Sequence, residues 1–346
     1  MPSASRERLT GIRPLWAVDG GRIDLLGSDF PVQDALPQVR IGDAPARVVF
    51  ASPSRVSVLV PAGLDGGATS VRIDGLPGET AFVDVAAEFA TGLHQVDNPA
   101  YDADGNLYVT CSGSRGQEVP VSIFKVRPNG SRESFVSGIV NATSLAFHPS
   151  GDLYVSSRFE GTIYRVHADG TFDIVASELG VACGLAFGPD GALFVGDRSG
   201  TIFQVEPGGH TRIFATLPAS IAAFYLALGG DGALYVTAPT LDAYDHVYRI
   251  DSTGKVEIFY SGFGRPQGLA IDPHGTLYVV EALAGWSGLY RFSSEGTPDL
   301  VLAGPSLVGV AFAPGGGLTV VSNDVAYRLD VTVPGGTPTR RPSRVM

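Results

Sequence analysis

A six-residue pattern, Asp-Gly-x-Leu-Tyr-Val, returns through most of the chain at a nearly fixed spacing. The clearest copy spans residues 104–109, and looser copies follow it. Their leucines are Leu107, Leu153, Leu193, Leu234, Leu277 and Leu318, at intervals of 46, 40, 41, 43 and 41 residues. A period in the low forties, with short strands and Gly-rich turns, is typical of a β-propeller blade. Six copies predict six blades of four antiparallel strands each.

Composition and charge exclude several classes of function. The chain has 346 residues and a net charge of -11, which disfavours binding to nucleic acid or to an anionic membrane surface. No run of about 18 apolar residues could span a membrane. Residues 1–13 contain no apolar signal segment, so we expect a cytoplasmic protein. Cys111 and Cys183 fall in different repeats without metal-ligand spacing and are expected to be free thiols.

Residues 14–85 do not follow the repeat. Short alternating segments at 22–26, 38–41, 46–51, 55–60, 70–73 and 80–85, separated by turn residues, predict a small immunoglobulin-like β-sandwich. The segments Gly27-Ser28-Asp29-Phe30, Val39-Arg40-Ile41-Gly42 and Val60-Pro61-Ala62-Gly63 resemble an IPT/TIG domain. That resemblance implies a spacer or an interaction module for a protein partner. Residues 1–13 are expected to be flexible.

Residues 86–330 are assigned to the propeller, and residues 331–346 are expected to be disordered because they are rich in Pro, Thr and Arg. The last repeat has no fourth strand of its own. Residues 87–93 (Ala-Glu-Phe-Ala-Thr-Gly-Leu) are similar to the outer strand at residues 133–139 (Glu-Ser-Phe-Val-Ser-Gly-Ile). We therefore expect residues 87–93 to complete the sixth blade, which hides two open sheet edges and closes the ring. The whole chain is predicted to be all-β.

Ligands of propellers usually bind at the mouth of the central channel, on the face opposite the Asp-Gly turns. Aligning the inner strands gives one mouth-facing position per blade. These positions are Asp97, Thr143, Cys183, Phe224, Gln267 and Val308. The loops between second and third strands are longest in blades one, four and five, which predicts a cleft between blade one and the opposite pair. Ordinary variation of loop length is the alternative.

The ends of the second strands and the long loops add further candidates. They are Arg158, Asp197, Arg198, Glu281, Tyr244, His246 and Trp286. Glu281 is the preferred general base because it leaves an apolar strand, where burial would raise its pKa. His246 and Asp97 are the other catalytic candidates. The alternatives are that Arg158, Asp197 and Arg198 form ion pairs between neighbouring blades and that His246 is merely solvated.

The run Gly184–Gly191, the segment Pro266-Gln267-Gly268-Leu269-Ala270 and the Leu-Tyr-Val repeats are similar to SMP-30/gluconolactonase and NHL-type six-bladed propellers. The resemblance covers residues 87–330. It implies a divalent cation, Ca²⁺ or Mg²⁺, at the mouth, with Asp97 in the first ligand position. Cys183, Phe224 and Gln267 occupy other matching positions. Phe cannot bind a hard cation and Cys binds one poorly, so a lost or altered metal site is expected.

Two functions follow from these observations. The first is an enzyme, by resemblance a hydrolase of the lactonase type or a lyase, that binds a small polar molecule at the channel mouth. Its ligand-binding residues would be Arg158, Asp197, Arg198, Phe224, Tyr244, Gln267 and Trp286. The second is a non-catalytic scaffold that binds protein or carbohydrate. The fold does not distinguish between them.

Overall fold

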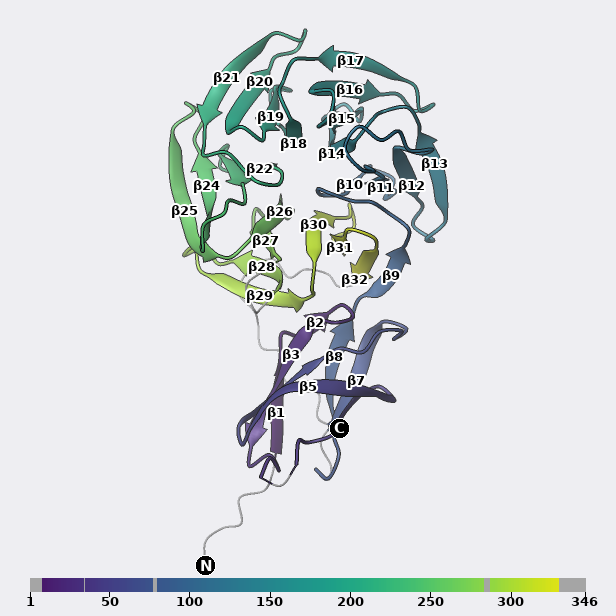
Figure 1. Cartoon of the computed structure of the whole chain (residues 1–346), viewed down its shortest axis with the longest axis vertical. Coiled ribbons are helices and arrows are strands. Elements are labelled where there is room, and N and C mark those ends of the chain that lie inside the picture. Colours follow the sequence, from purple (N-terminus) through teal and green to yellow (C-terminus); the bar gives the residue numbers. More distant parts are fainter. Residues whose placement is uncertain (1–7, 34, 77–79, 283–286, 330–346) are drawn as a thin grey trace, which may run out of the picture.

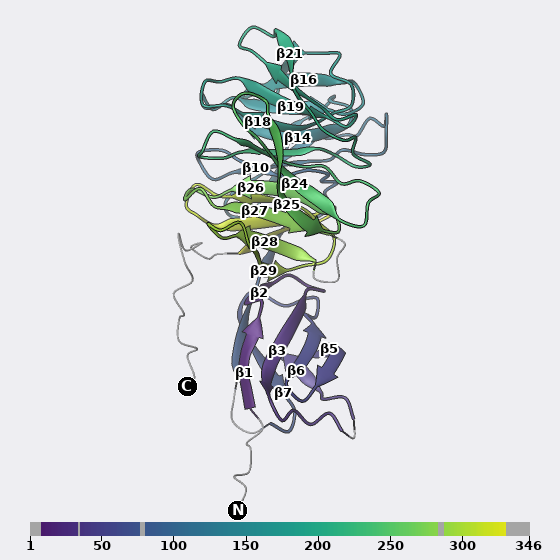
Figure 2. The ribbon, with the colours of Figure 1, turned by 90° about the vertical axis from the view of Figure 1, so that its left-hand side faces the viewer.

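A computed structural model describes residues 8–33, 35–76, 80–282 and 287–329 of the chain. All the regular elements in these ranges are β-strands, which confirms the all-β prediction. The strands form a ring of small sheets and a separate N-terminal unit at the edge of that ring (Figure 1). Figure 2 shows the ring from its side, with the N-terminal unit extending away from one edge of the ring.

The N-terminal unit consists of two sheets that enclose one apolar core. The first sheet has the order β1-β3-β6-β5, and β5 continues into the second, β4-β7-β8. The strands are β1 (Arg8–Arg13), β3 (Arg22–Ser28), β4 (Val39–Ile41), β5 (Ala44–Ser52), β6 (Arg55–Leu59), β7 (Gly67–Ile73) and β8 (Ala81–Val85). Ile23, Val58, Ile41 and Val71, from both sheets, are fully buried in this core. All six segments predicted in this region form strands.

Residues 8–13 are an exception to the expected flexible N-terminus. They form β1, which pairs with β3 along the edge of the first sheet. Leu9 and Ile12 are buried in the core of the unit, and this burial explains why the segment is ordered.

Four-stranded antiparallel sheets follow one another around the ring. Blade one has β10 (Ala100–Tyr101), β11 (Leu107–Thr110), β12 (Ile123–Val126) and β13 (Arg132–Val136). Blade two has β14 (Ala142–Phe147), β15 (Leu153–Ser157), β16 (Thr162–Val166) and β17 (Phe172–Ala176). Blade three has β18 (Ala182–Phe187), β19 (Leu193–Asp197), β20 (Thr201–Val205) and β21 (Thr211–Thr216). Blade four has β22 (Tyr225–Leu228), β23 (Leu234–Thr237), β24 (Asp245–Ile250) and β25 (Val256–Phe263).

The last separate sheet confirms the predicted closure of the ring. It contains β30 (Leu307–Phe312), β31 (Leu318–Ser322) and β32 (Ala326–Leu329), and its outer strand is β9 (Ala87–Ala90). β9 pairs antiparallel with β32, so Ala326 lies opposite Ala90. Strands from the two ends of the ring therefore share one sheet, as the similarity between residues 87–93 and 133–139 predicts.

The predicted count of six separate blades differs from the structure, in which five four-stranded sheets stand alone. The remaining strands are β26 (Pro266–Ile271), β27 (Leu277–Glu281), β28 (Gly288–Phe292) and β29 (Pro298–Ala303). They belong to a twelve-stranded sheet, because β2 (Trp16–Ala17) pairs in parallel with both β29 and β8. β2 thus joins the N-terminal unit to the ring through backbone hydrogen bonds (Figure 1).

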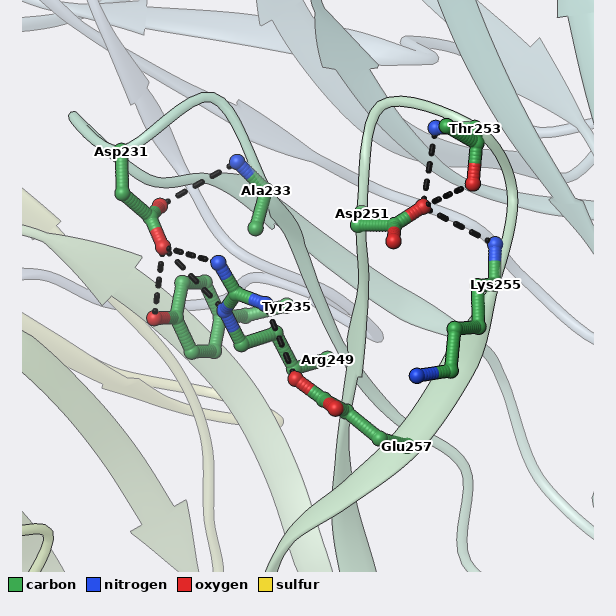
Figure 3. A network of polar contacts seen from close by, with 8 residues as sticks. All are labelled: Asp231, Ala233, Tyr235, Arg249, Asp251, Thr253, Lys255 and Glu257. Atoms are coloured by element: carbon green, nitrogen blue, oxygen red, sulfur yellow. Dashed lines mark hydrogen bonds and ion pairs between the residues drawn. The ribbon is translucent and has the colours of Figure 1, made fainter.

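The Asp-Gly turns form one face of the propeller, the turn face, and their aspartates hold the backbone (Figure 3). In blade four Asp231 accepts hydrogen bonds from the Ala233 amide at 3.1 Å and from Arg249 at 2.8 Å. Asp251 accepts bonds from the amides of Thr253 and Lys255. The glycines of these turns, such as Gly232 at φ +76°, occupy the left-handed region that favours glycine. The repeated pattern therefore fixes the turn face.

Within the described ranges, no helix is long and apolar enough to cross a membrane.

Candidate functional site

A cavity of about 430 Å³ opens where the inner strands begin and the second strands end, which is the predicted mouth of the channel. Its polar lining consists of Gln95, Arg115, Thr143, Arg158, Cys183, Arg198, Tyr225, Gln267 and Asn323. Its apolar lining consists of Val96, Val181, Ile221, Ala222, Ala223 and Val308. Four of the six predicted mouth positions are present: Thr143, Cys183, Gln267 and Val308. The cavity volume suits a small molecule.

Three arginines from three consecutive blades supply the charge of the cavity. Arg115 belongs to the loop between β11 and β12, while Arg158 and Arg198 directly follow β15 and β19. None of the three forms an ion pair with another described residue, and no described Asp or Glu lines the cavity. The ion pairs between blades that were the alternative for Arg158 and Arg198 are therefore not found among the described residues. The mouth is positively charged in a chain whose net charge is -11.

The loop that carries Arg115 is held against blade two by Asn141. Its side chain accepts a hydrogen bond from the Gly116 amide at 2.6 Å and donates one to the Ser114 carbonyl at 2.8 Å. The Arg158 guanidinium donates to the Gly113 carbonyl of the same loop at 3.2 Å. Burial and the nearby charge of Arg198 lower the pKa of Arg158. Arg158 thus lies within reach of the charge of Arg198 and is bonded to the loop that carries Arg115.

Phe224 does not face the cavity, and its neighbour Tyr225 does. The inner strands β14 and β18 of blades two and three, and also β26, have a β-bulge at this position, as at Ala182/Leu185, whereas β22 pairs regularly from Tyr225 onward. A bulge adds one residue to a strand. Without it, the residues at the start of β22 point to the opposite face from the residues at the aligned positions of the bulged strands. Phe224 is therefore fully buried in a blade core. It packs against Gly196, where a Cβ would come within 2.7 Å of the Phe224 Cβ.

Asp97 does not line the cavity, and only 1% of the residue is exposed. Burial raises the pKa of Asp97 to about 7, although hydrogen bonds from the Ser144 hydroxyl and the Asn98 amide partly offset this effect. The Asp97 charge in turn raises the pKa values of Cys183 and Tyr225, in addition to their own burial. The pKa of Cys183 reaches about 12, so its thiol is protonated at neutral pH.

The Tyr225 hydroxyl donates a hydrogen bond to the Gln267 side chain at 2.6 Å. This bond joins blade four to the inner strand β26 at the cavity wall. The Gln95 side chain is also engaged, since it accepts a hydrogen bond from the Thr110 amide at 2.7 Å. The Gln267 and Gln95 side chains are thus engaged in hydrogen bonds of the cavity wall, whereas Arg115 and Arg198 are exposed.

Glu281 and Asp197 occupy equivalent positions at the ends of their second strands, and both are buried. Glu281 accepts a hydrogen bond from the Arg265 backbone amide at 3.0 Å, and Asp197 accepts one from the Val181 amide at 2.8 Å. Each carboxylate thus fixes the loop that leads into the inner strand of its own blade. Neither lines the cavity. The predicted role of Glu281 as general base gains no support from this position.

The remaining candidates lie outside the cavity lining. His246 is on β24, where its ring contacts Tyr248 at a centroid distance of 5.6 Å. Tyr244, in the preceding loop, is 66% exposed. Trp286 lies outside the described residues. The expected cleft between blade one and the blades opposite therefore differs from the observed cavity, whose charged part is formed by blades one, two and three.

A hard divalent cation does not fit this lining. The described residues contain no group of three or more His, Cys, Asp or Glu side chains that could hold a metal ion. Among the described residues no carboxylate lines the cavity, the Cys183 thiol is protonated, and three arginines repel a cation. The residues present therefore do not match the Ca²⁺ or Mg²⁺ site that the resemblance implies.

Sequence reasoning missed Arg115, Tyr225, Gln95 and the apolar segment Ile221–Ala223. A signal for Arg115 was present, because the loop that carries it is the longest between second and third strands. Tyr225 depends on the missing bulge in blade four, which is a property of strand pairing. The Ile221–Ala223 segment lies in the connection between β21 and β22, which has eight residues where the connection between β17 and β18 has five.

Neither a protein-family model nor a curated protein sequence matches the chain. Solved structures do resemble it. A gluconolactonase from Xanthomonas campestris is 16% identical, with a TM-score of 0.59 over 86% of this chain and 98% of that one. An auxiliary nutrient binding protein from Bacteroides thetaiotaomicron is 12% identical, with a TM-score of 0.56 over 94% and 98%. A catalytically inactive virginiamycin B lyase from Staphylococcus aureus with quinupristin is 15% identical, with a TM-score of 0.52 over 90% and 99%.

Identities this low show the fold alone. The propeller arrangement is therefore established, and it is a scaffold that hydrolases, lyases and binding proteins share. The nutrient binding protein matches along nearly the whole chain, so the match includes the N-terminal unit as well as the ring.

Proposed function

We propose that this protein binds a small polar molecule at the mouth of the propeller channel. The observation that carries the proposal is the convergence of Arg115, Arg158 and Arg198 on one cavity of about 430 Å³. Guanidinium groups that lack a carboxylate partner are ready to bind an anionic or strongly polar group. Propellers commonly bind ligands at this mouth, and a cavity with a few convergent polar groups is the usual form of a ligand site.

We assign the rest of the chain around this site. We count β26–β29 as blade five, because their strand order matches that of the five separate sheets, and the propeller then has six blades, the last of which is the sheet that β9 closes. We assign the N-terminal unit to the immunoglobulin-like IPT/TIG class, as a spacer or an interaction module for a protein partner. Its parallel pairing with β29 through β2 supports a spacer that is rigidly attached to the ring.

A second candidate function is hydrolysis or elimination of a small substrate with Asp97 as the proton carrier. The pKa of about 7 favours this candidate, since a group that titrates near neutrality can both accept and donate a proton, whereas the burial of Asp97 behind the cavity lining counts against it. We expect Asp97→Asn to abolish turnover of a lactone panel if the candidate is right. Wild-type rates in that variant, or no turnover by the wild type, would leave ligand binding as the function.

Thermal-shift screening of small polar metabolites tests the main proposal. A ligand of the native state raises the melting temperature by mass action. Ala222→Trp fills the cavity with an indole, and Ala168→Trp places the same group on the turn face as a matched control. We expect stabilising compounds to lose their effect in Ala222→Trp alone. Hits that stabilise both variants equally would place binding elsewhere and contradict the proposal.

A further inference from the structure

The lining of the mouth is divided between two kinds of surface. Blades one, two and three contribute Arg115, Arg158 and Arg198. The segment that enters blade four contributes Ile221, Ala222 and Ala223, none of which has a polar side chain. The two surfaces adjoin, because the Ser220 amide donates a hydrogen bond to the Arg198 carbonyl at 3.0 Å.

The apolar surface is held in place by the backbone. The Ile221 amide donates to the Pro239 carbonyl at 2.9 Å, and the Ser220 hydroxyl donates to the same carbonyl at 2.8 Å. Pro239 is buried, so these bonds fix the segment against the loop of blade four. Ile221 nevertheless remains 40% exposed at the cavity. An isoleucine held open beside arginines offers apolar contact to whatever the arginines bind.

The cationic surface is equally fixed. Asn141 ties the loop of Arg115 to blade two, and Arg158 donates to the Gly113 carbonyl of that loop. The three guanidinium groups have no carboxylate partner among the described residues. A bound anion would relieve their mutual repulsion. A neutral sugar or lactone would not relieve this repulsion, and it would leave Ile221 facing polar groups.

We propose that the ligand of the mouth is an amphipathic organic anion. Its carboxylate or phosphate group lies against Arg115, Arg158 and Arg198, and its compact apolar body lies against Ile221 and the neighbouring alanines. The planar fork of arginine suits both oxyanions. This inference rests on the proposed function and narrows it to one class of ligand.

Calorimetric titration with three matched probes tests the charge and the apolar body separately. The probes are 4-phenylbutyrate, the neutral 4-phenylbutanamide, and acetate, which has the charge without the body. We expect 4-phenylbutyrate to bind at least tenfold more tightly than either of the others, because hydrogen bonds to charged groups and burial of a phenyl ring each contribute roughly that factor. Titration with 4-phenylbutyl phosphate then shows which oxyanion the arginines prefer.

Two pairs of variants locate the contacts. Arg198→Gln should weaken 4-phenylbutyrate roughly tenfold, whereas Arg212→Gln, on the exposed strand β21, should leave the affinity unchanged. Ile221→Ser should weaken 4-phenylbutyrate while leaving acetate unaffected, and Ile213→Ser, at an isoleucine 64% exposed on β21, is its control.

The outcomes separate this inference from the proposed function. Equal affinity for the acid and the amide, or for the acid and acetate, would overturn the inference. Binding of neutral polar compounds alone, lost in Ala222→Trp, would overturn it and leave the proposed function standing. If no compound of any class responds to Ala222→Trp, both fail.

Discussion

The two faces of this propeller are built differently. On the turn face the blades repeat the same device, in which an aspartate such as Asp251 or Asp272 accepts hydrogen bonds from backbone amides two and four residues later. On the mouth face the blades differ more, because the three arginines come from blades one, two and three whereas the segment that enters blade four is apolar. The repeated turns stabilise the fold, whereas the residues that differ between blades form the candidate site.

Adjacent residues at the mouth show the same division on a smaller scale. Asp197 and Arg198 are neighbours at the end of β19, yet Asp197 is buried against the Val181 amide and Arg198 lines the cavity. Successive side chains of a strand point in opposite directions, so one residue holds the loop while the next is free to meet a ligand. A polar residue at a strand end is therefore weak evidence for a role in the site.

The largest expected effect concerns Asp97. Unfolding returns its carboxyl to a pKa near 3.9, whereas the folded protein keeps the proton up to about pH 7. The folded state binds more protons between these values, so stability falls as pH rises through that range and levels off above it. Between pH 5 and pH 8 we expect Asp97 to lower the free energy of unfolding by roughly 2–3 kcal/mol.

Asp97→Asn should flatten this dependence, as measured by urea unfolding at several pH values. Asp104→Asn, at an exposed turn residue, is the control and should leave the dependence unchanged. Identical pH profiles for Asp97→Asn and wild type would show that the carboxylate is ionised in the folded protein.

The next effect tests whether Glu281 holds the structure or acts in the site. Glu281→Ala removes the acceptor of the Arg265 amide, which should lower the free energy of unfolding by about 2 kcal/mol. Glu281→Gln should recover most of this loss, because an amide oxygen still accepts the bond. Glu295→Ala, on an exposed turn of the same four strands, is the control. Unchanged stability of Glu281→Ala together with loss of ligand binding would show that Glu281 acts in the site.

A smaller effect is expected on the turn face. Asp231→Ala removes the partner of Arg249 and of the Ala233 amide, and we expect a loss of about 1 kcal/mol because the contacts are partly exposed to water. Ligand affinity at the mouth should be the same as in wild type. A change in that affinity would show that the two faces are coupled.

No effect is expected from divalent cations. Ca²⁺, Mg²⁺ or EDTA should leave the melting temperature unchanged, since the arginines of the mouth repel a cation. A rise in the melting temperature with Ca²⁺ that disappears in Asp97→Asn would support the metal site implied by the resemblance to gluconolactonase propellers.

The sequence predicts much of the fold because the fold depends on repetition. The Leu repeats locate the second strands, and the similarity between residues 87–93 and the outer strands predicts the closure that β9 provides. The junction at β2 is not predictable in this way. It is two residues long and pairs with strands from both parts of the chain.

The site is less predictable because it depends on strand pairing and on loops. The alignment of inner strands finds Gln267 and Cys183, but it places Phe224 at the mouth, since the missing bulge in blade four leaves no mark in the repeat. Ile221 lies in the connection between β21 and β22, which is longer than the connections into blades two and three. Its role follows from its position beside Arg198, which only the folded chain reveals.

The most direct test of the account is a crystal structure of the protein soaked with 4-(4-bromophenyl)butyrate. The bromine gives an anomalous signal that locates the apolar end without ambiguity. We expect the carboxylate to lie among Arg115, Arg158 and Arg198, and the bromophenyl ring to lie against Ile221. Ligand density at another surface, or a reversed ligand with its ring on the arginines, would contradict a mouth built for amphipathic anions.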